Sequence, residues 1–597
     1  MSASPRFRVC RRGDSPLSEA GPAQRERSSR QPRGGRGNVA LGCLVIGASL
    51  GLSGVPTAYA DDDGASEVRG SAADCTNATK LALPGNTTVS AATLVTSGTL
   101  VTTGNPDGVN LTLTGLPAFC RVQGVAKPSS DSSIYFEVWL PQETWNGKFL
   151  SSGEGGYAGA PNYSRLGLDG GLDELVRRGY ATASTDTGHV ATDPWWAVGH
   201  PQKARDYLYR SKHLVTVIAK QLILAYYGRP QTHSYFNSCS NGGRQGLLEV
   251  QRYPEDYDGV VVGAPWNFQS HSNAGFVWDA QALSAPGAAI PVAKLPAITA
   301  SVLAACDAND GLVDGVIGDP PACHWNPATL LCNGADTNSC LTQPQLTALE
   351  KIYAGPSDPV TGAKIFPGFD IGGEAGWAGI VSDLTGVGLE NGYFANLVFE
   401  NRNWNYSTFN FDTDMAYADA KVGSLGNSIE TDLSEAERRG VKIIQYHGWN
   451  DQVLQSAYSP EYYRQVVKTM GGLKKTQSFY RLFMVPGMTH CYFGPGATSF
   501  GGVGQQIPPV RDATHDIQTA LERWVEEGIA PDSMIATKYT DNAATTTTIK
   551  LTRPLCVYPK VPRYNGAGDP NDAASFSCVQ PPTRGNGDDD DQDSGDD

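Results

Sequence analysis

The chain has 597 residues, of which 40% are hydrophobic and 18% charged, and it contains 68 glycines and 38 prolines. This composition is typical of a globular, loop-rich protein and excludes a fibrous or largely disordered chain, and the length allows a large core plus an insertion or second domain. The formal net charge of -15 repels phosphate backbones, so we expect no nucleic-acid partner.

Residues 1–60 have the three parts of a secretory signal peptide. The segment is basic through Arg36, apolar over residues 39–52, and reaches T-A-Y-A before DDDG. This pattern predicts cleavage near Ala60 and a secreted or periplasmic protein. The apolar run is too short to span a bilayer, and no later segment has 18 uninterrupted apolar residues, so we expect no stable membrane insertion.

Short β-like runs alternate with helical patterns between residues 61 and 267. Strands are expected at residues 133–141, 148–153, 180–188, 233–239 and 259–265, and helices at 173–179, 204–228 and 244–254. Two further strands that end in loops are expected within 440–451 and 480–491, in a second part that covers residues 431–580. This alternation predicts an α/β fold with a mostly parallel sheet.

Residues 268–430 break this alternation, and we expect them to form an inserted domain. The segment holds four cysteines and several large aromatic side chains, among them Trp377, Tyr393, Phe394, Phe399 and Trp404. These aromatic residues fit two roles equally well, a lid over a ring-bearing substrate or an ordinary core. The chain then ends in DDDDQDSGDD, which predicts a disordered acidic tail over residues 581–597.

Ser240 lies in the sequence NSCSNGG, between a predicted strand and a predicted helix. The segment Ser240-Asn241-Gly242 matches the second half of the nucleophile elbow G-x-S-x-G, but Ser238 occupies the position of the first glycine. A serine in this context could also be a simple N-cap of the helix. The serine alone therefore leaves a catalytic and a structural role open.

Asp451 and His490 favour the catalytic role, because each follows a later predicted strand. The chain order Ser, Asp, His is that of α/β-hydrolase triads. The other histidines near aromatic or strand segments are expected to be scaffold residues: His189, His200, His233 and His447.

Ten cysteines remain after the predicted signal peptide, and an even number in an exported chain predicts five disulfides. Short separations favour three pairs, Cys306–Cys323, Cys332–Cys340 and Cys556–Cys578. We also predict a fourth pair, Cys75–Cys120. No cysteine spacing is typical of a zinc site. Cys239 precedes Ser240 and Cys491 follows His490, so a bond between them would hold Ser240 and His490 within roughly 14 Å.

The segments CSNGGRQG, GWND, PGMTHC, NGKFLSSGEGGYAG, STDTGH and YDGVVVGAPW resemble the tannase and feruloyl esterase family of α/β hydrolases, which also contains mono(2-hydroxyethyl) terephthalate hydrolases. The resemblance runs from about residue 75 to 580. It implies an α/β-hydrolase fold with a large inserted lid domain, Ser240 as nucleophile, His490 as base and Asp451 as orienting acid. It also implies a Cys239–Cys491 disulfide and an oxyanion hole formed by the N–H groups of Asn241 and Gly153.

Asp307, Asp310 and Asp314 lie in the loop CDANDGLVDGVIGDPPAC. Clustered carboxylates suit a hard cation, although a solvated acidic turn would show the same pattern and the spacing is not that of an EF-hand. The family resemblance favours structural calcium, with backbone carbonyls of Leu312 and Val316 as further ligands.

These observations favour a secreted serine carboxylesterase for aromatic, phenolic acid esters, most similar to a feruloyl esterase and with no organic cofactor. Tannase activity on gallate esters and hydrolysis of mono(2-hydroxyethyl) terephthalate are alternatives. The expected partner is a small aromatic ester, either free or attached to plant polysaccharide or polyphenol. A calcium-stabilised binding protein without catalysis and a serine peptidase of the same fold remain as functions of another class.

Overall fold

The computed structural model describes residues 70–581 apart from 97, 105, 107, 165–169, 383–387 and 544. The predicted signal peptide at 1–60 and the acidic tail from 582 onward therefore lie outside the described residues. None of the helices in the described ranges combines the length and the apolar character that a membrane crossing requires.

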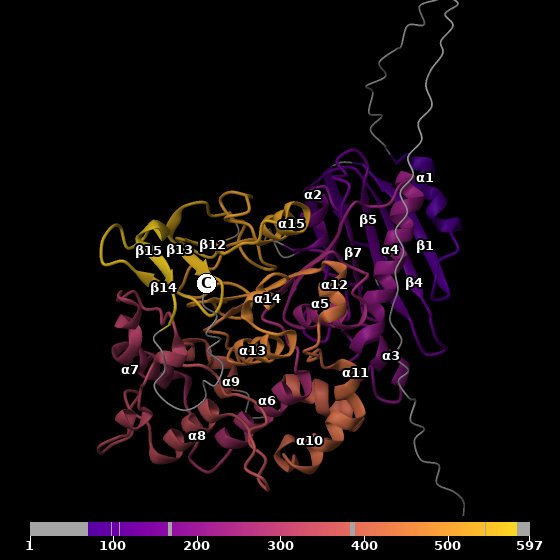
Figure 1. Ribbon diagram of the computed structural model, residues 1–597. Helices are drawn as coiled ribbons and strands as arrows, with labels where there is room; N and C mark the ends of the chain where they lie inside the picture. The colour runs from indigo at the N-terminus through magenta and orange to yellow at the C-terminus, as the bar shows by residue number, and fades with distance from the viewer. Residues whose placement is uncertain are drawn as a thin grey trace, which may run out of the picture. The chain divides into compact units, whose positions relative to one another are not determined.

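The described part of the chain contains a nine-stranded sheet (Figure 1) with the strand order β1-β4-β5-β7-β6-β8-β9-β10-β11. The strands are β1 (Thr87–Val95), β4 (Phe119–Ala126), β5 (Ile134–Pro141), β6 (Phe149–Ser152), β7 (Ala181–Thr185), β8 (Ser234–Cys239), β9 (Gly259–Gly263), β10 (Lys442–Gly448) and β11 (Tyr480–Val485). From β7 to β11 in this order, neighbouring strands pair in parallel. This arrangement matches the predicted α/β class.

The sheet has an antiparallel edge that includes two strands not predicted from the sequence, β1 and β4. β5 pairs antiparallel with β7, β4 with β5, and β1 with β4. β1 and β4 precede the first strand that the sequence pattern indicated. β1 has an irregular register between Val89 and Ala91, which interrupts the period-two alternation that marks a strand in a sequence.

Helices cover both faces of the sheet. α4 (Ser211–Tyr227), α5 (Asn241–Arg252) and α13 (Tyr458–Met470) pack on one face, and α2 (Leu172–Arg177) and α15 (Ile517–Glu527) pack on the other. β9 shows the two-sided burial directly, because Val260 and Val262 join the first core cluster while Val261 joins the second. Burial on both faces is why this strand is a continuous apolar run in the sequence.

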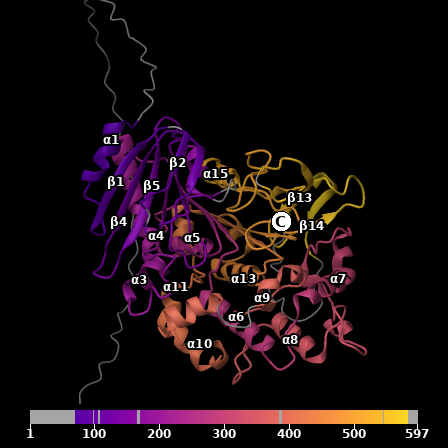
Figure 2. The same cartoon turned by 180° about the vertical axis from the view of Figure 1, so that it is seen from behind.

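The segment 268–430 is largely helical, and its main helices are α6 (Gln269–Leu283), α7 (Leu295–Cys306), α8 (Gln343–Ala354), α9 (Ala378–Ser382), α10 (Thr413–Ala418) and α11 (Ser424–Gly426). α6 contacts α8, α9 and α10, and these helices lie together in both views (Figures 1 and 2). Tyr393 and Phe394 belong to a π-helical segment, Asn391–Val398. The domain boundaries at 268 and 430 remain predictions.

Smaller elements complete the described chain. The short helices are α1 (Ala72–Asn77), α3 (Pro201–Arg205), α12 (Ser434–Arg439) and α14 (Leu473–Gln477). Two-stranded sheets join β2 (Gly98–Val101) to β3 (Thr112–Leu116), β12 (Ser533–Tyr539) to β13 (Ile549–Cys556), and β14 (Val561–Tyr564) to β15 (Phe576–Val579). The predicted helix at 204–228 contains a π-helical segment, Asp206–Arg210, before α4.

Five disulfides are formed, and they join the five pairs named in the sequence analysis. They are Cys75–Cys120, Cys239–Cys491, Cys306–Cys323, Cys332–Cys340 and Cys556–Cys578. Cys239–Cys491 has the largest sequence separation, 252 residues, and its Cα atoms are 6.0 Å apart. It joins the end of β8 to the loop after β11, two strands that belong to different parts of the sheet.

Candidate active site

Ser240 lies on a sharp turn between β8 and α5. Its backbone has φ 66 and ψ -126, and its hydroxyl does not cap the helix. A positive φ at a residue other than glycine is strained, and the neighbouring chain holds it in place. Ser240 N–H donates to the carbonyl of Gly263, and the Trp266 N–H donates to the carbonyl of Ser240. Ser240 thus occupies the N-cap position of α5, but its side chain forms no capping hydrogen bond, and the turn has the geometry of a nucleophile elbow.

Ser238 occupies the position where the elbow pattern has a glycine. Its side chain has room there because the residues that face it, Gly153 and Gly242, have no side chains. It is buried, and a Cβ atom at Gly153 would lie 2.8 Å from Ser238 Cβ. A Cβ atom at Gly242 would overlap Ser238 Oγ. The space that the usual elbow glycine leaves open is thus filled by the Ser238 side chain, and the glycines at 153 and 242 become necessary instead.

Asp451 and His490 meet at the ends of β10 and β11. His490 Nδ1 lies 2.7 Å from Asp451 Oδ2, and the Asp451 carboxylate is buried. His490 N–H donates to Gln452 Oε1 at 3.1 Å. The Cα atoms of Cys239 and Cys491 are 6.0 Å apart. Because Ser240 and His490 are each one peptide from a half-cystine, the bridge keeps their Cα atoms within roughly 14 Å of each other. The three predicted residues are therefore collected at the same edge of the sheet.

His447, which was expected to be a scaffold residue, is a second histidine in contact with Asp451. Its Nε2 lies 3.0 Å from Asp451 Oδ2, and its Nδ1 lies 2.7 Å from Ser459 Oγ on α13. Burial alone would raise the pKa of Asp451, but His490 and His447 outweigh it and hold that pKa well below its usual range. The carboxylate is therefore ionised at neutral pH.

Asn241 and Gly153, the predicted oxyanion donors, lie next to the elbow. Asn241 is the first residue of α5. Its backbone N–H has no intrahelical acceptor, because the first N–H groups of a helix have none. Its side chain is fixed by three hydrogen bonds: Asn241 Nδ2 donates to the Glu154 carbonyl at 2.9 Å, and Asn241 Oδ1 accepts from Arg244 Nε at 2.8 Å and from the Tyr207 hydroxyl at 3.2 Å. Gly153 directly follows β6, and its ideal Cβ position is 2.8 Å from the Cα of Gly242.

A buried ion pair supports the loop that carries Gly153. Lys212 Nζ donates to Glu154 Oε1 at 2.8 Å and to the Ser152 carbonyl at 2.7 Å. The same carboxylate oxygen accepts from the N–H of Thr185 at 3.0 Å. Because these bonds tie the loop to β7 and α4, it is held rigidly against the elbow.

Two cavities lie at the boundary between the sheet and the inserted segment. One has a volume of about 450 Å³ and is lined in part by Gln452 and Val453, directly after Asp451. The other has a volume of about 1060 Å³ and is lined by Tyr157, His189, Trp195, Trp196 and Trp404, among others. The Tyr157 hydroxyl donates to the Leu389 carbonyl at 2.5 Å, and Leu389 lines both cavities.

The aromatic residues of the insertion divide between the two expected roles. Trp377, Tyr393 and Phe394 are buried in core clusters of the insertion, and Phe399 packs against the same core as Phe394. Trp404 also faces the larger cavity. Among the histidines, His189 is buried and stacks on Trp196 with ring centroids 3.8 Å apart, and burial lowers its pKa to about 3. His200 pairs with Asp131, at 2.9 Å.

The acidic loop closed by Cys306–Cys323 holds the three predicted carboxylates, but no set of their oxygens, one from each residue, lies within 4.8 Å of one another. Burial and the neighbouring Asp314 and Asp307 raise the pKa of Asp310 to about 6. Asp307 Oδ2 accepts the N–H of Gly315 at 2.9 Å, and Asp314 Oδ2 accepts from Arg553 at 2.8 Å. The N–H groups of Leu312 and Val316 donate to the Asp310 and Asp314 side chains.

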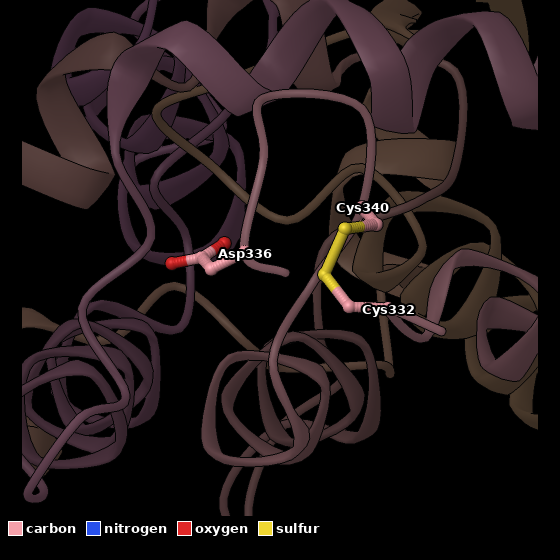
Figure 3. Close-up of side chains that lie close together, drawn as sticks. All are labelled: Cys332, Asp336 and Cys340. Atoms are coloured by element: carbon pink, nitrogen blue, oxygen red, sulfur yellow. A yellow bond between two sulfur atoms is a disulfide. The ribbon is translucent and has the colours of Figure 1, made fainter. Parts of the chain in front are cut away.

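A second acidic loop of the insertion does not suit a metal. Cys332, Asp336 and Cys340 lie close together (Figure 3), but the two sulfur atoms are bonded to each other. A disulfide provides no thiolate for a metal ion, and Asp336 forms an ion pair with Lys294.

Sequence reasoning missed two side chains at the triad, His447 and Gln452. His447 lies at the end of β10, four residues before Asp451, which is in the loop that follows this strand. Alternation along β10 could have placed His447 on the face opposite Tyr446, but no sequence signal identifies Ser459 of α13 as its partner.

Comparisons with known proteins agree with this architecture. The family model described as tannase and feruloyl esterase matches residues 120–579. An uncharacterized esterase of Xanthomonas campestris is 40% identical, over 85% of this chain and 92% of the relative. A protein described as "probable feruloyl esterase B-1" of Aspergillus flavus is 33% identical, over 79% of this chain and 91% of the relative.

Solved structures show the same fold. The crystal structure of feruloyl esterase B from Aspergillus oryzae superposes with a TM-score of 0.78 and 30% identity, covering 85% of this chain and 100% of that one. Tannin acyl hydrolase from Aspergillus niger superposes with a TM-score of 0.66 and 21% identity, covering 86% of this chain and 95% of that one. The chain therefore belongs to the tannase and feruloyl esterase family and is a carboxylic ester hydrolase.

Proposed function

We propose that this esterase is an exported serine hydrolase of phenolic acid esters that uses Ser240, His490 and Asp451. The observation that carries the proposal is the disulfide that ties the strained Ser240 turn to the His490–Asp451 pair. An elbow, a histidine and a buried carboxylate at three strand ends form the set that acyl transfer requires.

The proposed mechanism follows from these positions. His490 removes the proton of Ser240, and the serine oxygen attacks the ester carbonyl. Asp451 holds the His490 ring through Nδ1 and stabilises the imidazolium that forms. The N–H groups of Asn241 and Gly153 donate to the carbonyl oxygen as it becomes negative, and one such donor is worth about 10²–10³ in kcat. The alcohol leaves with the proton of His490, and water then releases the acid.

The names of the relatives support a feruloyl esterase-like activity on a small aromatic ester, which could be attached to plant polysaccharide or polyphenol. Gallate esters and the terephthalate monoester remain alternatives within the same chemistry. Five disulfides support export, since disulfides persist in oxidising compartments. A binding protein without catalysis would not need the strained serine turn, nor a buried Asp451 carboxylate that accepts hydrogen bonds from several donors.

The test is hydrolysis of methyl ferulate, methyl gallate and mono(2-hydroxyethyl) terephthalate by the purified chain, beside a Ser240→Ala variant. We expect wild type to hydrolyse at least methyl ferulate and Ser240→Ala to lose nearly all activity with an unchanged melting temperature. Equal rates for wild type and Ser240→Ala on every ester would refute the serine mechanism and favour the binding-protein alternative.

Calcium in the Asp307–Asp310–Asp314 loop is a separate proposal. The proposal is supported by the raised pKa of Asp310, to which the negative charges of Asp314 and Asp307 contribute after burial, and carbonyls of Leu312 and Val316 would complete the oxygen ligands. Such an ion would stabilise the insertion and take no part in the chemistry.

Calcium binding is tested by unfolding with calcium and with a chelator. Free calcium at 100 times its Kd adds about 2.7 kcal/mol to the unfolding free energy. We expect the chelator to lower the melting temperature, calcium to restore it, and Asp310→Asn to abolish the difference. A melting temperature that is the same with chelator and with calcium would contradict the proposal.

A further inference from the structure

Asp279 of α6 is a buried carboxyl group at the wall of the 450 Å³ cavity. The residue is 5% exposed. Within the described ranges, its side chain forms no hydrogen bond or ion pair, and the shift of its pKa has burial as its single cause. A buried polar group without a partner is costly. The Asp279 oxygens are not among the fully enclosed polar atoms that lack a partner, and the residue lines the cavity, so a molecule bound there can supply a partner.

The cavity lies directly against the proposed acid–base pair. Gln452, in its wall, accepts the N–H of His490 at 3.1 Å. Val453, also in its wall, donates its N–H to Asp451 Oδ1 at 2.8 Å. Gln452 and Val453 therefore connect the wall of this cavity to His490 and Asp451, while the triad and the oxyanion donors do not themselves line it.

The rest of the lining suits a neutral aromatic ring. Phe276, Ile380, Leu389 and Val453 provide apolar surface, and the volume is within the range of small-molecule sites. The polar side chains of this wall are Asp279, Glu390 and Gln452, and none of its described residues is Lys, Arg or His. Glu390 already accepts the N–H of Gly388 at 3.2 Å, which leaves Asp279 as the acid in need of a partner.

We propose that Asp279 determines specificity by forming a hydrogen bond with a hydroxyl group on the aromatic ring of the ester. The inference rests on the proposed function and adds the feature of the substrate that the site recognises. Burial raises the pKa of Asp279 well above its usual value and so favours the neutral form, which can both donate to and accept from a phenolic hydroxyl.

This arrangement ranks the possible substrates. A site built to bind a substrate hydroxyl discriminates strongly against the analogue that lacks it, because the polar group of the protein is then left unpaired. A terephthalate monoester would bring a carboxylate into a cavity without a cation in its described wall, and an unpaired buried charge is costlier than a neutral hydroxyl. Hydroxylated rings are therefore favoured over both unsubstituted and anionic ones.

The experiment compares kcat/KM for methyl p-coumarate and methyl cinnamate, which differ only in the ring hydroxyl. Wild type is expected to prefer the p-coumarate by about tenfold or more, the scale of a hydrogen bond in a closed site. Asp279→Leu, which keeps the branched side-chain skeleton and is unable to form hydrogen bonds, should bring the ratio close to one by lowering p-coumarate turnover. Asp279→Asn, which keeps a donor and an acceptor, should retain part of the preference.

Glu350→Gln is the matched control, because it removes an acid from the exposed side of α8 in the same insertion; its ratio should equal that of wild type. A wild-type ratio of one, or an Asp279→Leu ratio equal to wild type, would overturn the inference, and the wild-type comparison does not depend on any variant folding. Hydrolysis of both esters at equal rates leaves the proposed function intact. Hydrolysis of neither ester above the Ser240→Ala level would remove that function and the inference with it.

Discussion

The Asp451 carboxylate accepts four hydrogen bonds, two on each oxygen. Oδ2 accepts from His490 and His447, and Oδ1 accepts from the N–H groups of Val453 and Leu454 at 2.8 Å each. The ionised Asp451 carboxylate can only accept, so His447 Nε2 carries the proton of their hydrogen bond. Ser459 Oγ accepts from Gln445 Nε2 and lies 2.7 Å from His447 Nδ1. His447 is therefore a positioning residue that acts through the carboxylate.

Loss of the His447 donor should affect turnover more than binding. A hydrogen bond to a charged group contributes about 1.5–3 kcal/mol, so His447→Ala is expected to lower kcat by about 10- to 100-fold with little change in KM. Since His447 helps to lower the pKa of Asp451, Asp451 should become protonated at a higher pH in this variant, and activity lost through that protonation should disappear at a higher pH. His447→Gln, whose amide can still donate to Asp451, should recover most of the activity.

The control for this prediction is His200→Ala, which removes a histidine from an Asp pair far along the chain from the triad. It should leave kcat and the pH profile unchanged. If His447→Ala loses stability but keeps the wild-type pH profile and kcat per folded molecule, His447 has only a structural role.

The depressed pKa of Asp451 also predicts how stability depends on pH. A carboxyl whose folded pKa lies below its unfolded value, about 3.9, contributes stability that is complete above that value and lost as pH falls through the folded pKa. The difference in unfolding free energy between wild type and Asp451→Asn should therefore be constant from pH 7 to pH 5. It should shrink only in strongly acidic solution. Urea unfolding over this range tests it, and a difference that already shrinks between pH 7 and pH 5 would be inconsistent with an ionised, well-satisfied Asp451.

In the strand–turn–helix unit around Ser240, we expect substitutions at Ser238 and Gly242 to have non-additive effects on the free energy of unfolding. A Cβ atom at Gly242 would overlap Ser238 Oγ and lie 2.6 Å from Ser238 Cβ. Gly242→Ala should destabilise the protein by about 1–3 kcal/mol, the usual cost of overpacking. In a Ser238→Gly background most of that cost should disappear, so the double variant should be more stable than the sum of single effects predicts.

Gly246→Ala is the control for this cycle, because its Cβ would meet Val262 and Phe236 at 2.7 and 2.8 Å and does not approach Ser238. Its cost should be the same in both backgrounds. Denaturant midpoints of the single and double variants provide the measurement. Equal costs of Gly242→Ala with and without Ser238 would show that the serine does not fill the elbow.

The elements that could be predicted from the sequence are those whose burial leaves a local pattern. β5 to β11 are apolar or alternating runs closed by glycine, proline or aspartate, and α4 and α5 have apolar residues at helical spacing, so their positions follow from periodicity. β1 is irregular and none of its residues is fully buried, so the same rule does not detect it. Ser240, Asp451 and His490 were recognisable because each follows a strand. His447 was not, because its role depends on Ser459, a residue of α13 whose contact with β10 is purely tertiary.

At the scale of the whole molecule, the insertion separates two halves of one sheet. β9 ends at Gly263 and β10 begins at Lys442, yet the two strands pair in parallel as neighbours. Ser240 belongs to the first half, and Asp451 and His490 belong to the second. The site therefore requires the two halves to be aligned across a long stretch of intervening chain, and Cys239–Cys491 is the covalent link directly at the point of alignment.

Removal of this link should cost both stability and alignment. A bridge that closes a loop of 252 residues contributes about 5 kcal/mol in the chain-entropy model, so Cys239→Ser/Cys491→Ser should unfold at clearly lower denaturant concentration. Turnover per folded molecule should fall as well, because Ser240 and His490 lose their tether. Removal of Cys556–Cys578, which spans 22 residues between β13 and β15, should lower stability with turnover per folded molecule unchanged. Equal turnover in the two variants, measured on folded protein, would mean that the sheet alone aligns the site and that the Cys239–Cys491 bridge only stabilises the fold.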